Sequence, residues 1–178
     1  MPAPKAKRLY WREILPGDRK KIAAASNTSK TGGGARDLRF PDAHYRPTLL
    51  KMFPQDANGR GDRPIRRGTL VWDEAGGQRS QSIDYWPATK ARPTEGRIAR
   101  LNSMPPVKSQ LPPPKKDDRV VMLLIQEDTG NLRVRFAQES SLRSGNWHEA
   151  IAGPILAGLD APKGRRTPQG AIELKGGV

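Results

Sequence analysis

The pattern of apolar and polar positions is clearest around residue 130. Val120 to Ile125 is a continuous apolar run, and Leu132 to Phe136 alternates apolar with polar side chains. The polar, turn-forming segment QEDTGN separates the two. A continuous apolar run is typical of a strand buried on both faces, whereas alternation is typical of a strand with one buried face. The pattern therefore predicts a β-hairpin over residues 120–136.

A second hairpin is predicted between residues 69 and 86. Thr69 to Trp72 has the composition of a strand, and Ser82 to Trp86 alternates apolar with polar residues. Glu74 to Gly77 ends in two glycines, which is typical of a tight hairpin turn. A shorter alternation at Leu38 to Phe40 predicts a strand that Pro41 ends.

Other segments have weaker patterns. Leu9 to Leu15 fits either a strand or a short amphipathic turn, and Asp18 to Ala25 fits either a helical turn or a strand. Pro47 to Phe53 is an apolar cluster that we expect to pack as a short core segment. Asn146 to Leu156 is expected to be helical, with an interruption at Gly153-Pro154 because proline disfavours helix interiors.

Proline and glycine shape the rest of the chain. Residues 103–117, SMPPVKSQLPPPKKD, lack periodicity, so we expect an extended, semi-rigid segment and no helix. Several short strands, few helices and many turn residues predict a mainly β chain with short helices, α+β in class, arranged as a small barrel or pseudobarrel.

The chain is expected to form one compact domain with modest extensions, since 178 residues suffice to bury one core. We expect a basic flexible tail over residues 1–8 and the folded domain over residues 9–140. Residues 141–178 are expected to add a C-terminal helix and a basic extension rich in glycine and proline.

Net charge narrows the class of partner. The chain has 32 Lys and Arg against 18 Asp and Glu, which gives a formal net charge of +14. Such an excess favours a polyanionic partner, most often nucleic acid. The alternative is a basic protein whose charge has no such role.

Composition also excludes several kinds of site. With no cysteine there is no disulfide or thiolate metal site, and two histidines leave little for a zinc or acid–base centre, so no cofactor is expected. No apolar run approaches a membrane span, and the first residues lack the apolar region of a signal peptide. We therefore expect a cytoplasmic protein with no membrane partner.

The segment Ser26 to Phe40, SNTSKTGGGARDLRF, combines three glycines with hydroxyls and cations. Glycine permits positive φ and a close approach of the backbone to another surface. Short polar side chains and cations suit phosphates and guanine edges. A flexible surface loop is the alternative, and the lysine precedes the glycines, unlike in a Walker loop. The candidate DNA-binding residues of this region are Lys20, Lys21, Asn27, Thr28, Ser29, Lys30, Thr31, Gly32, Gly33 and Arg36.

A second candidate cluster comprises Arg92, Thr94, Glu95 and Arg97. Arginine donates two hydrogen bonds to guanine O6 and N7, and glutamate accepts from cytosine N4, so the cluster suits a site that contains a C·G pair. The alternative is a solvated strand end with a surface salt bridge.

Five segments in order resemble the N-terminal effector-binding domain of EcoRII-type restriction endonucleases. They are KKIAAASNTSKTGGGARDLRFP, LLKMFP, GTLVW with IDYW, RPTEGRIARL and VVMLLIQEDTGNLRVRF. The resemblance covers residues 9–140. It implies the DNA-binding pseudobarrel fold shared with plant-type transcription-factor domains.

The resemblance also implies how DNA would be held. In that family a loop of Asn-x-Thr-Gly-Gly character is one arm of a wrench that grips the major groove, and Asn27 to Gly33 would occupy it. The second arm has an Arg-x-x-Glu-x-Arg segment before an aliphatic residue, which Arg92 to Ile98 matches. The family's His-Gln after the glycines is replaced by Gly34 to Arg36, which implies a different base preference.

Two other functions remain open at this stage. Glu173 and Lys175 have the Glu-x-Lys spacing of metal-dependent nucleases, with Asp160 as a second carboxylate for Mg²⁺. So little chain follows Lys175 that this triplet is a weak nuclease signal. Binding of RNA or single-stranded DNA is the other alternative.

Together, these patterns predict a sequence-selective double-stranded DNA-binding protein without a catalytic core of its own. We expect a role in restriction or phage defence, with a separately encoded nuclease or other effector as a candidate partner.

Overall fold

The computed structural model describes residues 4–23, 37–58, 64–99, 103–162, 164 and 166–178. The strands are β1 (Ala6–Glu13), β2 (Leu38–Pro41), β3 (Gln55–Asn58), β4 (Pro64–Glu74), β5 (Gly77–Trp86), β6 (Glu95–Ile98), β7 (Val120–Glu127), β8 (Leu132–Gln138) and β9 (Gln169–Glu173). The helices are α1 (Pro16–Ala23), α2 (Asp42–Met52), α3 (Pro105–Gln110), α4 (Glu139–Arg143) and α5 (Glu149–Asp160).

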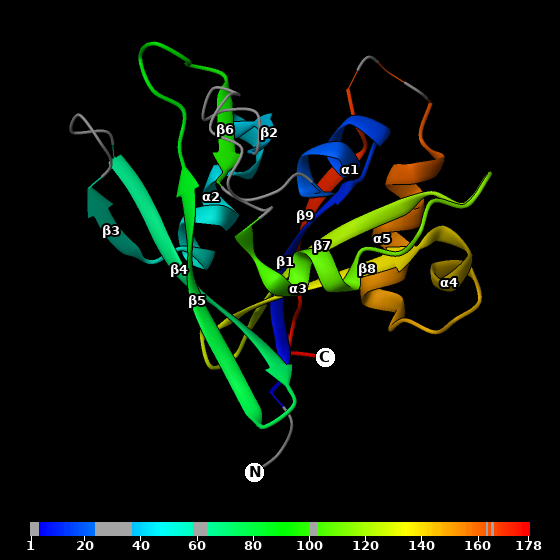
Figure 1. The fold of residues 1–178 in the computed structure, drawn as a ribbon. Helices are drawn as coiled ribbons and strands as arrows, with labels where there is room; N and C mark the ends of the chain where they lie inside the picture. The colour runs from blue at the N-terminus through cyan, green and yellow to red at the C-terminus, as the bar shows by residue number, and fades with distance from the viewer. Residues whose placement is uncertain (1–3, 24–36, 59–63, 100–102, 163, 165) are drawn as a thin grey trace.

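The strands form one curved sheet in the order β2-β6-β5-β4-β8-β7-β1-β9, with β3 paired to β4 (Figure 1). Neighbouring strands are antiparallel except β4 and β8, which meet in parallel at Leu70 and Leu132. The predicted class, mainly β with short helices, is confirmed.

The side chains of strand β7 belong to two separate clusters of buried hydrophobic residues, one on each face of the strand. Met122 and Leu124 face one cluster of buried side chains, and Val121 and Leu123 face the other. Helix α5 covers the second cluster, while α2 contributes Leu49 and Met52 to the first. The continuous apolar run is thus buried on both faces, as the sequence predicts.

Helix α2 lies between the two ends of the sheet. It contacts β6 near one end and both β1 and β9 at the other. The Tyr45 hydroxyl donates a hydrogen bond of 3.3 Å to the Gln169 carbonyl of β9. The predicted core segment at residues 47–53 is therefore the second half of a longer helix that bridges the curved sheet.

Both predicted hairpins are confirmed, as is the short strand that Pro41 ends. Residues 9–13 of the segment 9–15 belong to strand β1, and residues 18–23 of the segment 18–25 belong to helix α1. The structure thereby resolves both alternatives that the sequence leaves open.

Two predictions about proline are wrong. Residues 103–117 contain helix α3, because Pro105 and Pro106 occupy its first turn, where no amide needs an internal partner. Helix α5 continues through Gly153 and Pro154 to Asp160. Its buried side chains Ile151, Ile155 and Leu159 pack on the sheet. The free energy gained by this burial outweighs the loss of the one helical hydrogen bond that Pro154 cannot donate.

The predicted ends of the folded domain also need correction. β1 begins at Ala6, inside the predicted flexible tail, where Ala6 and Val178 exchange backbone hydrogen bonds of 2.7 and 3.1 Å. β9 lies inside the predicted C-terminal extension, and it pairs with β1 along its whole length. Residues from both predicted extensions therefore belong to the sheet. No helix in the described ranges is both long enough and apolar enough to cross a bilayer.

Candidate nucleic-acid interface

The predicted first arm lies outside the described residues. This applies to Asn27, Thr28, Ser29, Lys30, Thr31, Gly32, Gly33 and Arg36. Both flanks of that segment are described, since α1 ends at Ala23 and Asp37 immediately precedes β2. In α1, Lys20 is exposed, and the Lys21 amine lies 3.6 Å from the Asp18 carboxylate.

The predicted second arm is a tight turn followed by β6. Thr89 and Arg92 exchange backbone hydrogen bonds of 3.2 and 2.9 Å, and the Glu95 amide donates to the Arg92 carbonyl at 3.4 Å. Arg92 and Thr94 are exposed, and the Thr94 carbonyl accepts a hydrogen bond of 3.1 Å from the Asp42 amide. The turn is thereby fixed to the start of α2.

Glu95 lies between two exposed arginines. One carboxylate oxygen is 3.0 Å from Arg92 Nη1, and the other is 3.3 Å from Arg39 Nη1 on the neighbouring strand. The Arg92 and Arg39 side chains are 56% and 39% exposed. One carboxylate thus contacts two guanidinium groups on this surface. We call Arg39, Arg92 and Glu95 the arm cluster.

Arg97 is held much more firmly than the arm cluster. Its Nη1 lies 3.0 Å from the buried Asp37 carboxylate, and its guanidinium lies 4.7 Å from the centre of the Trp86 ring. Only 18% of the Arg97 side chain is exposed. An ion pair and a cation–π contact together fix the orientation of this side chain. The structure therefore gives Arg97 a positioning role between β2, β5 and β6.

A polar network of Asp42, Tyr85 and Arg46 packs against β6. The Asp42 carboxylate is 1% exposed and accepts hydrogen bonds from the Tyr85 hydroxyl and from Arg46 Nε, the latter at 2.6 Å. Burial raises the pKa of Tyr85, and its hydrogen bond to Asp42 raises it further, so the hydroxyl stays a donor. A side chain at Gly96 would collide with Asp42 and with the Phe40 ring, so β6 lies directly on this network.

Helix α1 is connected to the arm cluster through Arg12. This buried guanidinium donates to Asp18 Oδ2 at 3.2 Å and to the backbone carbonyl of Arg39. Asp18 belongs to α1, and Arg39 belongs to β2. The helix that contains Lys20 and Lys21 is thereby tied to the strand that contributes one arginine of the cluster.

The candidate nuclease residues have separate partners. Asp160 ends α5, where its carboxylate lies 2.5 Å from Arg143 Nη2, whereas Glu173 on β9 lies 3.1 Å from Arg8 Nε. No group of three or more His, Cys, Asp or Glu suited to a metal ion occurs within the described ranges. Among the residues that the structure describes, no arrangement favours the nuclease alternative.

Arg39 is one of the cations of the glycine-rich segment that were expected to suit phosphates and guanine edges, but it was not among the candidate DNA-binding residues. The signal was present, because alternation in β2 buries Leu38 and Phe40 and turns Arg39 to the other face, directly opposite Arg97 in the pairing with β6. Only the pairing of β2 with β6 brings Arg39 to Glu95.

No protein-family model and no curated protein matches this chain.

Proposed function

We propose that the chain is a sequence-selective double-stranded DNA-binding protein that grips the major groove with two loop arms. The proposal includes a pseudobarrel fold of the kind found in EcoRII-type N-terminal domains, and a cytoplasmic role in restriction or phage defence. A separately encoded nuclease or other effector would act on the bound DNA, and the chain itself would need no cofactor.

The arm cluster is the observation that supports this proposal most. Arg39 lies on β2, Glu95 on β6 and Arg92 in the turn before β6, and β2 follows the glycine segment of the predicted first arm in the sequence. Strand β2, which follows the first predicted arm in the sequence, pairs with β6, which belongs to the second, and Arg39 lies opposite Arg97. This pairing would let both arms contact one stretch of DNA.

The chemistry of the arm cluster suits base recognition. An exposed guanidinium held by a carboxylate loses less rotational freedom when it donates to guanine O6 and N7. Glu95 keeps lone pairs that accept from cytosine N4. Lys20 on the connected helix α1 is exposed and suits a phosphate contact, which positions a protein on DNA without recognising sequence.

Selection of bound duplexes from a random pool tests the proposal, followed by measurement of Kd for the selected and a scrambled duplex over a series of salt concentrations. We expect one enriched motif and a Kd that rises steeply with salt, since bound cations release counterions from DNA. Lys20→Ala should weaken both duplexes equally and lower the salt slope by about 1.

Competition at one salt concentration separates the remaining alternatives. An RNA duplex and a single-stranded DNA of the selected sequence should compete far less well than the selected DNA duplex. A pool that yields no motif, or RNA that competes better than duplex DNA, would overturn the proposal.

A further inference from the structure

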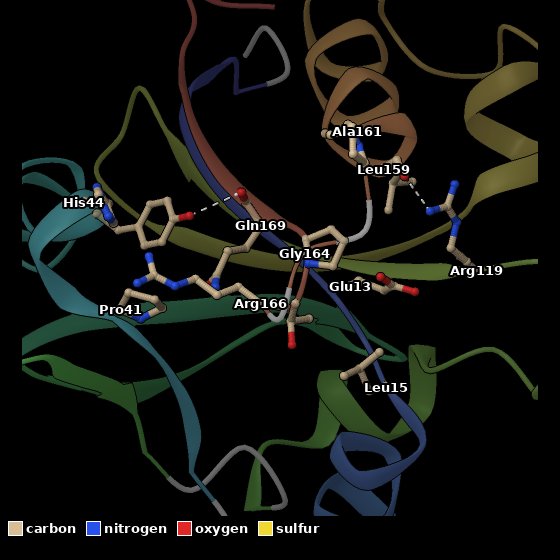
Figure 2. A pocket seen from close by; sticks show the side chains of 15 residues that line it. Glu13, Leu15, Pro41, His44, Arg119, Leu159, Ala161, Gly164, Arg166 and Gln169 are labelled. Carbon is tan, nitrogen blue, oxygen red and sulfur yellow. Dashed lines mark hydrogen bonds between the residues drawn. The ribbon is translucent and has the colours of Figure 1, made fainter.

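A cavity of about 770 Å³ lies between α2, the C-terminal end of α5 and the chain that leads into β9 (Figure 2). It is distinct from the arm cluster, none of whose side chains lines it. Cavities of roughly 300–1,000 Å³ are typical of sites for small organic ligands. The volume therefore suits a molecule of mononucleotide size.

One wall of the cavity is organised by Tyr45 and Gln169. The Tyr45 hydroxyl donates to the Gln169 backbone carbonyl, and the Gln169 side-chain oxygen accepts a hydrogen bond of 2.7 Å from the Tyr10 hydroxyl. This second bond fixes the amide so that its NH₂ group is the free end. Burial raises the pKa of Tyr45, which keeps its hydroxyl protonated at neutral pH.

The positive groups at the cavity differ in how far they are neutralised. Arg119 donates to both oxygens of Glu139 and to the Leu159 carbonyl, so its charge and its donors are used within the protein. Arg166 makes no ion pair in the described part of the chain, and its side chain extends toward Pro41 and His44 (Figure 2). Glu13 lies with Arg119 on the other side of the cavity (Figure 2).

Apart from His44 and Thr167, the rest of the lining is apolar and rich in rings. Leu15, Leu159 and Ala161 contribute aliphatic surface. The aromatic ring of Tyr45 and the rings of Pro41, Pro162 and Pro168 contribute flat surfaces. Flat apolar surfaces favour contact with a planar ring of a ligand, and an unpaired guanidinium favours a phosphate or a carboxylate.

We propose that this cavity binds a small organic anion in which a phosphate or carboxylate group is attached to a planar ring. Arg166 would bind the acidic group, and Tyr45 with the prolines would contact the ring. Mononucleotides and aromatic carboxylic acids share this chemistry. The site does not depend on DNA binding, since it uses none of the residues of the arm cluster.

Isothermal titration calorimetry on the whole chain tests this site with four probes: adenosine 5′-monophosphate, adenosine, indole-3-carboxylate and indole. At least one of the two anions should bind with a Kd of about 1 mM or tighter. Its neutral counterpart should bind at least about tenfold more weakly, because the guanidinium contact is lost. The comparison of the two anions distinguishes a nucleotide from an aromatic acid.

Two variants locate the binding. Arg166→Gln should weaken the bound anion at least about tenfold, whereas Arg135→Gln, which removes the same charge from an exposed strand position outside the cavity, should leave it unchanged. Ala161→Phe fills the cavity from an exposed position after α5 and should abolish binding without lowering the midpoint of thermal unfolding. If neither anion binds, or if Arg166→Gln binds as well as the unchanged protein, the proposal is wrong.

Discussion

Arg97 on β6 and Asp37, which immediately precedes β2, form an ion pair of 3.0 Å across 60 residues of sequence. Asp37 is 3% exposed, so removal of Arg97 would take an ion-pair partner away from a buried charge. The pair fixes the strand that leaves the glycine segment against the strand of the second arm.

We therefore expect Arg97→Ala to lower the free energy of unfolding by about 2–4 kcal/mol, because the buried Asp37 carboxylate loses this ion pair and the Trp86 ring loses its cation–π contact. Urea denaturation measures this loss. The double variant Asp37→Asn with Arg97→Gln should be more stable than the sum of its single variants predicts, because the two charges are removed together. Additive effects would show that the pair does not couple the strands.

Glu95→Gln should alter DNA binding rather than stability. Loss of the negative charge between Arg39 and Arg92 should strengthen binding to a scrambled duplex. Replacement of one carboxylate oxygen by an NH₂ donor leaves a weaker, uncharged acceptor for cytosine N4, which should reduce the preference for the selected duplex by about 1–3 kcal/mol. The ratio of the two Kd values at fixed salt measures the effect. Glu74→Gln is the matched control, since Glu74 also pairs with an arginine, Arg79, but at the distant β4–β5 turn. Equal ratios for both variants would exclude base recognition by Glu95.

Gly96→Ala should destabilise the protein by about 1–3 kcal/mol, because the added Cβ would lie 2.8 Å from the Phe40 ring and closer still to Asp42. Thermal unfolding measures the change. Gly17→Ala is the control, since a Cβ there meets nothing within 4 Å and an alanine favours helix α1. A Gly96→Ala protein as stable as the control would mean that β6 can shift away from the buried network.

The lowered pKa of the Glu139 carboxyl should make the stability of the protein depend on pH. Contacts of Glu139 with Arg119 lower the pKa of this carboxyl to about 2, from an ordinary value of 4.5. Because the pKa is lower in the folded state, the ionised carboxylate stabilises the folded protein at pH values above the ordinary pKa of 4.5. This contribution disappears as the pH falls from about 4.5 to about 2. Because solvent reaches the cluster, we expect about 1–2 kcal/mol.

Urea denaturation at pH 7 and pH 3 measures this contribution. Glu139→Gln should lose stability at pH 7 and should show a smaller difference between the two pH values than the unchanged protein. The same difference in both proteins would assign the acid sensitivity to other carboxylates.

The sequence predicted those parts of the fold in which neighbouring segments pair. The hairpin of β7 and β8 follows from local alternation and a polar turn, and so does that of β4 and β5. β9 was missed because QGAIE is short and contains glycine, and only its pairing with β1 stabilises it as a strand. Helix α3 was missed because prolines that oppose a helix interior are compatible with its first turn.

For the candidate site, sequence identified Arg92, Glu95 and Arg97 as a group but not their different environments. Their spacing alone does not show that Asp37 and Trp86 enclose Arg97 while Arg92 stays exposed. That difference arises from the pairing of β2 with β6, which joins residues distant in sequence. The cavity has the same origin, since its walls include Leu15, Tyr45, Arg119 and Arg166, which are distant in sequence.

The place of β1 has a consequence for the order of folding. β1 lies between β7 and β9, and its contact between Tyr10 and Gln169 spans 159 residues. Large loops must close before such contacts form, so they slow folding, whereas the β4–β5 and β7–β8 hairpins need only short loops. The first strand of the chain is therefore expected to join the sheet late. Until it does, the apolar edge of β7 is open, and a second unfolded copy can pair there instead, so refolding yield should fall as protein concentration rises.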